Sequence, residues 1–217
     1  MTFDLLDAVR RYRLIAILRG FDSDRIVPLA EALYEGGIRL IEVTMNTTDA
    51  ERQLRILAER AEGRWHVGAG TVLDAASARR ALDCGATYFV TPNVDEEVMA
   101  FAAEAGVDIL PGALTPTEIA RAHRLGAKAV KLFPASRLGP GYVKDLQGPL
   151  PHIPLVAVGG VDLDNAAAYL EAGAVGLGLG SGLLDRQALR DGDYARITAR
   201  AREFARAAGV GSGTGSR

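Results

Sequence analysis

The sequence predicts an α/β protein, a (β/α)₈ or TIM barrel, on three observations. Short apolar runs recur at intervals of about 20 to 27 residues, the length of one strand plus one helix. A glycine precedes five of these runs, where it suits the end of a helix. Polar and glycine residues collect where the runs end, which is the face on which such barrels carry their functional groups.

Eight strands are expected in order along the chain. They begin near residues 14, 39, 66, 86, 107, 128, 155 and 174, and three have clear limits, Leu14 to Leu18, His66 to Gly70 and Leu155 to Val158. The glycines that end the preceding helices stand in the pairs Gly37-Ile38, Gly85-Ala86, Gly106-Val107, Gly126-Ala127 and Gly173-Ala174. The helices between the strands are amphipathic, as in Thr117 to Leu125.

A doubly wound open sheet is the alternative for the same alternation of strands and helices. Its first turn usually carries Gly-x-Gly-x-x-Gly, whereas the first expected strand is followed by Arg19-Gly20-Phe21-Asp22. The barrel is therefore the preferred prediction. Its strand ends carry, in order, Arg19, Glu42 with Thr44, Gly70-Thr71, Thr91-Pro92-Asn93, Pro111-Gly112, Lys131 with Phe133-Pro134, Gly159-Gly160, and Gly180-Ser181.

Length and composition indicate one domain. With 217 residues, 48% of them hydrophobic, the chain can bury one large core. No linker-like break divides it, so a single barrel domain is expected over residues 1–208. The Gly- and Ser-rich segment 209–217 is expected to be a flexible tail.

Composition also limits the partners. No run approaches the roughly 18 apolar residues of a membrane span, and the N-terminus lacks the order of a signal peptide, so we expect a cytoplasmic protein. The formal net charge of −2, with interspersed charges, argues against nucleic acid and for a small-molecule partner. Cys84 is the only cysteine, which excludes an internal disulfide and a cysteine-based zinc site.

Lysine is rare in this chain. Only three of its 25 basic side chains are lysines, and one of them, Lys131, lies within the apolar run 127–134. Arginine stays protonated at any reachable pH, whereas a desolvated lysine can lose its proton and attack a carbonyl carbon as a neutral amine. Lys131 is therefore the candidate nucleophile. The alternative is a lysine at a strand end with a packed stem and a solvated head.

Period-two alternation separates Lys131 from the apolar Val130 and Leu132, which belong under the helices. The same alternation separates Glu42 from its apolar neighbours. We expect Lys131 and Glu42 inside the barrel as a desolvated amine and a carboxylate, an arrangement that suits Schiff-base catalysis with Glu42 moving protons. A buried Lys–Glu ion pair is the structural alternative, although burying both charges usually gains little stability.

Two expected strands end in glycine-rich turns, Gly159-Gly160 and Gly176 to Gly182. Their backbone N–H groups, each turn followed by a helix start, are typical of the anion cradle that barrels use for phosphate, and Ser181 adds a hydroxyl. Tight turns alone are the alternative explanation of the glycines. The Gly70-Thr71 pair offers an amide and a hydroxyl to a carboxylate.

Metal chemistry is poorly supplied, and we expect neither a metal nor another cofactor. The three histidines are expected at the far end of a strand (His66), in mid-helix (His123) and in a Pro-rich loop (His152). None of these histidines is expected near the functional face, so a Ser-His-Asp triad would lack its histidine base.

Six ordered motifs resemble the 2-keto-3-deoxy-6-phosphogluconate (KDPG) and 6-phosphogalactonate (KDPGal) aldolase family. They are Ile15-Ala16-Ile17-Leu18-Arg19-Gly20, Ile41-Glu42-Val43, Val67-Gly68-Ala69-Gly70-Thr71-Val72, Val90-Thr91-Pro92-Asn93, Lys131-Leu132-Phe133-Pro134 and Val158-Gly159-Gly160. The resemblance runs from about residue 10 to 205. It implies a class I aldolase, usually a homotrimer, that cleaves a phosphorylated 2-keto-3-deoxy sugar acid to pyruvate and glyceraldehyde 3-phosphate. Lys131 would be its Schiff-base lysine and Glu42 its proton-transfer residue.

The sequence departs from the gluconate branch of this family at two positions. That branch commonly has an arginine shortly after the catalytic glutamate, where this chain has Asn46, and a threonine before the Gly-Gly pair, where this chain has Val158. Both differences, together with the run Pro134 to Lys144, resemble the galactonate enzymes. The resemblance then implies these substrate-binding residues: Arg19, Thr71, Phe133, Val158, Gly160, Gly180 and Ser181.

Three alternatives remain at this point. The first is the gluconate epimer as substrate, which leaves the proposed chemistry unchanged. A phosphate-binding isomerase or epimerase barrel would need paired carboxylates or a metal in place of Lys131. A non-catalytic phosphosugar sensor would share the scaffold and form no covalent adduct with pyruvate.

Overall fold

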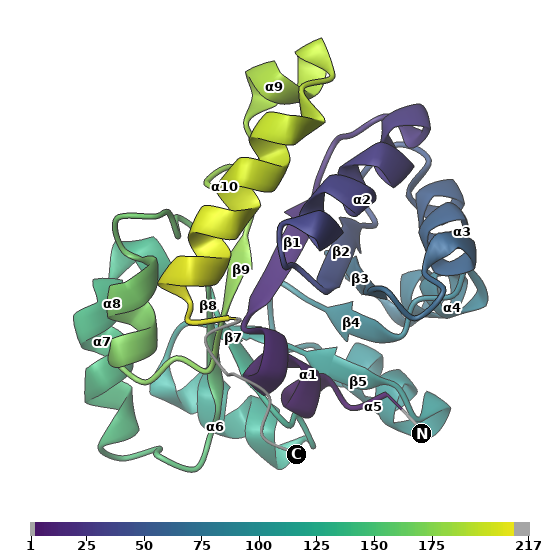
Figure 1. Ribbon diagram of the computed structural model, residues 1–217. Coiled ribbons are helices and arrows are strands. Elements are labelled where there is room, and N and C mark those ends of the chain that lie inside the picture. Colours follow the sequence, from purple (N-terminus) through teal and green to yellow (C-terminus); the bar gives the residue numbers. More distant parts are fainter. Residues whose placement is uncertain (1–2, 211–217) are drawn as a thin grey trace, which may run out of the picture.

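The computed structural model describes residues 3–210, and within them nine parallel strands form one sheet that curls into a nearly closed barrel (Figure 1). The sheet order is β5-β4-β3-β2-β1-β9-β8-β7-β6. The strands are β1 Leu14–Leu18, β2 Leu40–Thr44, β3 His66–Gly70, β4 Tyr88–Val90, β5 Asp108–Leu110, β6 Gly112–Ala113, β7 Val130–Leu132, β8 Leu155–Val158 and β9 Gly176–Leu179.

The expected count of eight strands is one short, and Pro111 explains the difference. It lies between β5 and β6, which are the two ends of the sheet order. Leu110 accepts a hydrogen bond from the Thr91 N–H (3.2 Å), whereas Pro111 accepts one from the Lys131 N–H on the opposite side (2.9 Å). Because proline has no N–H, the ladder breaks at this residue and the expected fifth strand divides into two segments. Because only Pro111 separates the two edge strands of the sheet, the sheet closes on itself, which excludes the open-sheet alternative.

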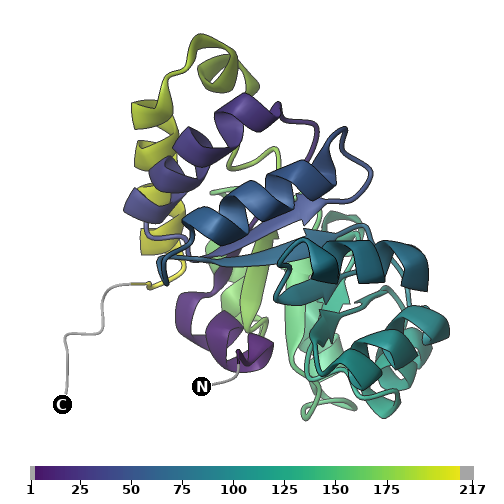
Figure 2. The ribbon, with the colours of Figure 1, turned by 90° about the vertical axis from the view of Figure 1, so that its right-hand side faces the viewer.

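Helices surround the barrel, as two views at right angles show (Figures 1 and 2). They are α1 Leu5–Tyr12, α2 Ile26–Glu35, α3 Ala50–Arg60, α4 Ala75–Asp83, α5 Glu96–Ala105, α6 Pro116–Arg124, α7 Gly139–Gln147, α8 Ala166–Glu171, α9 Arg186–Asp191 and α10 Tyr194–Ala207, with short 3-10 turns η1 Ser23–Arg25 and η2 Ala135–Arg137. The five glycines expected at helix ends all have positive φ, between 66° and 111°.

Local sequence explains where α6 begins. Thr115 accepts a hydrogen bond from the Glu118 N–H (3.3 Å), and the Glu118 carboxylate accepts one from the Thr115 N–H (2.8 Å). This reciprocal capping box satisfies two amide groups that an isolated helix end would leave free, and Pro116 adds a preset φ at the first position. The helix therefore starts one residue before the expected Thr117.

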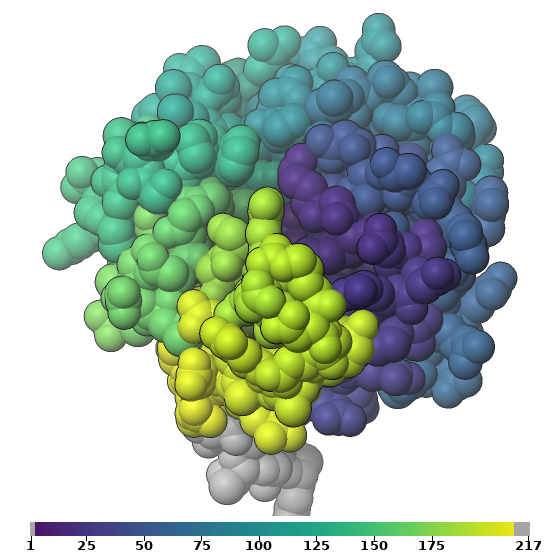
Figure 3. Space-filling view, turned by 90° about the horizontal axis from the view of Figure 1, so that it is seen from above, coloured from purple at the N-terminus to yellow at the C-terminus, as the bar shows by residue number. Residues whose placement is uncertain are grey.

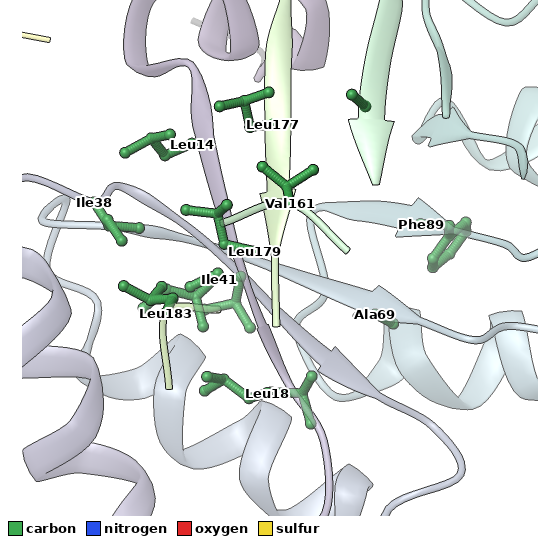
Figure 4. Packing of buried hydrophobic residues seen from close by; sticks show 14 of the residues in the cluster. Leu14, Leu18, Ile38, Ile41, Ala69, Phe89, Val161, Leu177, Leu179 and Leu183 are labelled. Carbon is green, nitrogen blue, oxygen red and sulfur yellow. The ribbon is translucent and has the colours of Figure 1, made fainter. Parts of the chain in front are cut away.

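Apolar side chains form two separate clusters, one under the helices and one inside the barrel. Leu14, Leu18 and Ile41 belong to the outer cluster, which Figure 4 shows at close range. Ile15 and Tyr88 belong to the inner cluster. Alternate side chains of β1 thus pack into the outer and the inner cluster. Full burial of each leucine contributes about 1.5 to 3 kcal/mol to the stability of the fold.

The first and last quarters of the described chain meet on the barrel surface. Helix α10 packs on α2, so the last and first quarters of the described chain lie side by side, as the adjoining yellow-green and purple surfaces in Figure 3 illustrate. Gly209 and Val210 close α10 by donating backbone hydrogen bonds to Arg206 and Ala205. Residues 211–217 lie outside the described residues, so the flexible tail stays a prediction.

Helix α1 closes the amino-terminal end of the barrel. The Leu5 N–H donates a hydrogen bond to the Asp108 carboxylate at the start of β5 (2.8 Å). The Lys128 ammonium, just before β7, binds both Asp108 (2.9 Å) and Asp4 (2.7 Å). These contacts fix α1 against two neighbouring strands and place the barrel opening at the other end.

We expect Asp108→Ala to destabilise the protein by about 1 to 3 kcal/mol, because it leaves a helix N–H and part of an ammonium group without their acceptor. Urea unfolding measures the change. Asp145→Ala, which removes an exposed carboxylate from α7, is the matched control. Equal unfolding free energies for the two variants would contradict this role of Asp108.

Candidate active site

One pocket of about 330 Å³ lies at the carboxyl ends of the strands, and every site residue expected from the sequence lines it. These residues are Arg19, Glu42, Thr71, Lys131, Phe133, Val158, Gly160, Gly180 and Ser181. They come from six different strands or the turns that follow them, as in a barrel whose functional face is its carboxyl-terminal face. Ile17, Pro92, Gly159, Val161, Gly178 and Gly182 complete the lining.

Lys131 is the central residue of β7 and points into this pocket with 6% of its surface exposed. Its ammonium nitrogen lies 4.8 Å from the centre of the Phe133 ring. The register partner on β6 is Gly112, where a Cβ atom would overlap the backbone of Pro92. Burial lowers the pKa of Lys131, and the charge of Arg19 lowers it further, whereas Glu42 opposes the shift. The neutral amine is therefore more accessible than in an exposed lysine.

Glu42 lies on β2, 2% exposed, and also faces the pocket. Burial raises the pKa of its carboxyl group, and the charges of Lys131 and Arg19 partly offset this effect. Within residues 3–210 no direct ion pair joins Glu42 to Lys131, so the structural alternative of a closed ion pair does not describe this site. The amine and the carboxylate face one cavity with space for a ligand.

Gly70 makes room for Glu42. The Glu42 side chain leans over Gly70 on the neighbouring strand, and a Cβ atom at that position would overlap the Glu42 carboxylate. The Gly68-Ala69-Gly70 run thus leaves the inner face of β3 bare beside the carboxylate. The glycines of this strand contribute to the site because they have no side chains that would displace the Glu42 carboxylate or the Tyr88 ring.

Arg19 is held at the mouth of the pocket by two side chains. Its guanidinium donates hydrogen bonds to the Thr71 hydroxyl (3.0 Å) and to the Asn46 amide oxygen (3.1 Å). Thr71 has a φ of 54°, a left-handed conformation that is strained for a β-branched residue by about 1 to 3 kcal/mol. The strain aims the hydroxyl at Arg19, and sequence reasoning missed the part that Asn46 plays in holding the guanidinium.

The two glycine-rich turns lie together in the pocket. Gly159 and Gly160 both have positive φ (94° and 74°), which turns the chain sharply after β8. Among the described residues, the N–H groups of Gly160 and Ser181 have no protein acceptor. Helices α8 and α9 begin only at Ala166 and Arg186, so the turns themselves present these N–H groups.

Ser136 is a second residue that sequence reasoning missed. Its side chain lies against Gly160, since a Cβ there would overlap the Ser136 hydroxyl, and its N–H binds the Gly159 carbonyl (3.0 Å). No local signal in the Phe133-Pro134-Ala135-Ser136 run predicts this contact, because it depends on how η2 folds back on the turn after β8.

Comparison with known proteins identifies the family. Residues 5–200 match the family model described as KDPG and KHG aldolase. The chain belongs to the KDPG and KHG aldolase family. Its similarity to named members of the family is considerable: a protein from Rhizobium meliloti (strain 1021), named probable 2-dehydro-3-deoxy-6-phosphogalactonate aldolase, is 40% identical over 171 residues, which cover 78% of this chain and 81% of that protein.

Other members are similar to comparable degrees. A 2-dehydro-3-deoxy-phosphogluconate aldolase from Pseudomonas aeruginosa is 35% identical over 195 residues, which cover 89% of this chain and 88% of that protein. A solved KDPG aldolase from Legionella pneumophila, with pyruvate captured at low pH as a covalent carbinolamine intermediate, superposes with a TM-score of 0.85 at 25% identity and covers 93% of this chain and 98% of that one. These aldolases are lyases, and similarity alone does not separate the gluconate from the galactonate substrate.

The described residues hold no group of three His, Cys, Asp or Glu side chains arranged to bind a metal ion. His66 packs on Phe3 (4.6 Å between ring centres), and His123 packs on His152 (5.3 Å). The helices within residues 3–210 include none with the length and apolar character that crossing a membrane requires.

The Gly70→Ala variant should fold normally yet lose turnover, because its methyl group displaces the flexible end of Glu42 rather than backbone. Misplacing a catalytic group by about 1 Å costs up to about 100-fold in rate. Steady-state aldol cleavage, with circular dichroism to check folding, measures the effect. Gly141→Ala, where an added Cβ meets nothing within 4 Å, is the control and should retain full activity. Equal turnover in both variants would contradict this account of Gly70.

Proposed function

We propose that this protein is a class I aldolase that cleaves 2-dehydro-3-deoxy-6-phosphogalactonate to pyruvate and D-glyceraldehyde 3-phosphate. The observation that carries the proposal is the desolvated Lys131 amine, which faces Glu42 across one pocket without an ion pair between them. We also propose that residues 1–208 form a single (β/α)₈ domain, in which β5 and β6 count as one barrel strand interrupted at Pro111.

Lys131 is the nucleophile of the proposed reaction. Its lowered pKa increases the fraction of neutral amine, which attacks the C2 ketone of the substrate and forms a carbinolamine. Loss of water gives an iminium that accepts the electrons of the C3–C4 bond. The Legionella pneumophila relative, with pyruvate captured as a carbinolamine, supports this step by its similarity.

Glu42 moves the protons. It donates a proton as the carbinolamine loses water, and then accepts the proton of the C4 hydroxyl directly or through water as the C3–C4 bond breaks. Its raised pKa suits a group that must hold and release a proton near neutral pH. The enamine of pyruvate that remains on Lys131 is protonated at C3, and hydrolysis of the resulting iminium releases pyruvate.

The remaining pocket residues orient the two ends of the substrate. Arg19 and Thr71 bind the carboxylate end, since a guanidinium and a hydroxyl lie together at the mouth. The free N–H groups at Gly160 and Ser181, with Gly180 beside them, receive the phosphate. The Phe133 ring lies beside the Lys131 amine and keeps water away from it. No metal or organic cofactor takes part in this scheme.

The choice of the galactonate epimer rests on two positions. Val158 lines the pocket with an apolar side chain, and Asn46 holds Arg19 where the gluconate branch commonly has an arginine. The 2-dehydro-3-deoxy-6-phosphogluconate epimer is the alternative substrate. The homotrimer implied by the resemblance also remains a prediction, which sedimentation equilibrium measures directly.

Lys131→Ala and Lys131→Arg should both abolish cleavage, because a methyl group cannot attack the ketone and a guanidinium cannot form the iminium. With borohydride and pyruvate, the native enzyme should gain a stable adduct on the peptide that contains Lys131, and neither variant should. Lys144→Ala, in α7, should behave as the native enzyme. An isomerase or a sensor predicts no adduct at all, and turnover by either Lys131 variant would refute the Schiff-base assignment.

Val158→Thr should shift selectivity toward the gluconate epimer, because its hydroxyl adds a hydrogen-bonding group beside the C4 region of the substrate. One such bond contributes about 0.5 to 1.5 kcal/mol, or roughly 2- to 13-fold in the ratio of kcat/KM values. Side-by-side assays of both epimers measure the ratio. Val175→Thr introduces the same group at the amino end of β9 and should leave it unchanged. No shift in Val158→Thr would mean that C4 is recognised elsewhere.

A further inference from the structure

Tyr88 is fully buried inside the barrel, and its hydroxyl group has no hydrogen-bond partner within residues 3–210. It is the first residue of β4 and belongs to the inner apolar cluster. A buried hydroxyl without a partner costs about 1 to 3 kcal/mol, and such groups in folded proteins are normally satisfied by protein or internal water. We therefore expect the Tyr88 hydroxyl to have a hydrogen-bond acceptor inside the barrel.

The strand register directs Tyr88 toward Glu42. Tyr88 on β4 pairs with Gly68 on β3, and Gly68 pairs with Glu42 on β2. The Tyr88 ring lies across Gly68, because a Cβ atom there would overlap the ring. Since Gly68 has no side chain, nothing on β3 separates the end of the tyrosine from the glutamate. The two polar groups share one layer of the barrel interior.

The Glu42 carboxylate, in turn, lacks a hydrogen-bond donor among the described residues. Within the described part of the chain its carboxylate receives no direct hydrogen bond from protein, although it is 2% exposed. The charge of Glu42 raises the pKa of the Tyr88 hydroxyl beyond the effect of burial, as proximity of the two groups requires. A buried donor without an acceptor thus lies on the strand layer of a carboxylate to which no protein group within residues 3–210 donates a hydrogen bond.

We propose that Tyr88 is a positioning residue for Glu42: its hydroxyl donates a hydrogen bond to one internal water molecule, which in turn donates one to the Glu42 carboxylate. Internal water molecules in folded proteins typically bridge buried polar groups that lack a protein partner. The bridge holds Glu42 from the side opposite the substrate and stabilises its charged form. This role rests on the proposed aldolase function, in which Glu42 transfers protons.

Other charged groups approach this layer from several elements. Lys131 on β7 and Arg19 after β1 favour the charged form of Glu42. Asp108, the register partner of Tyr88 on β5, is already bound by Leu5 and Lys128. His66 begins β3, and burial lowers its pKa. Tyr88 differs from these groups because its buried hydroxyl has no hydrogen-bond partner within residues 3–210.

Tyr88→Phe tests the bridge, because it keeps the ring and removes only the hydroxyl. Without the donated hydrogen bond the pKa of Glu42 rises further, so the acid limb of the kcat profile should move to higher pH. On that limb kcat should fall about 2- to 13-fold, which corresponds to one hydrogen bond, with KM little changed. Tyr169→Phe, a buried tyrosine in α8 outside the pocket, is the matched control and should leave the profile unchanged.

A double-mutant cycle separates positioning from a structural effect. If Tyr88 acts through Glu42, Tyr88→Phe should lower kcat in the native background and should not lower it further in Glu42→Gln. An equal fall in both backgrounds, or a native pH profile in Tyr88→Phe, would overturn the proposal. Thermal unfolding checks that each variant is folded. Failure of the proposed function itself looks different, since the native protein would then form no borohydride adduct with pyruvate.

Discussion

Desolvation of one amine and one carboxylate inside the same barrel is the constraint on which the rest of this site depends. Water would stabilise the charged forms of Lys131 and Glu42, and burial works against both of them. The Coulomb attraction between the two groups opposes that shift but does not draw them into a closed ion pair. Burial thus moves the two pKa values toward each other, and the two groups line one pocket.

Glycine residues create that space. Gly70 leaves room for the Glu42 carboxylate, Gly68 for the Tyr88 ring, and Gly178 for the Val158 side chain, whose methyl group would lie 2.7 Å from an added Cβ. All three lie on strands whose other face packs under the helices. A barrel filled by large side chains in every layer would be more tightly packed and would hold no ligand at this end.

Rigidity at the mouth of the pocket comes from a hydrogen-bonded set rather than from apolar packing. Arg19 is exposed, and its hydrogen bonds to Asn46 and Thr71 fix the direction of the guanidinium. The strained φ of Thr71 indicates that the surrounding structure holds this residue against its preference. The resulting preorganised cation lowers the pKa of Lys131, and in the proposed function it also binds the substrate carboxylate.

The sequence by itself determined which residues face inward, because a strand reverses its side chains at every residue and the inward positions of β2 and β7 hold Glu42 and Lys131. It also determined the helix ends, since glycine and capping residues act locally. Only the tertiary structure decided that Pro111 divides one expected strand in two, that Asn46 holds Arg19, and that the Tyr88 ring lies across Gly68. Period-two alternation in the sequence shows on which face of a strand a side chain lies. Its hydrogen-bond partner depends instead on register and side-chain direction between segments that are far apart in the chain.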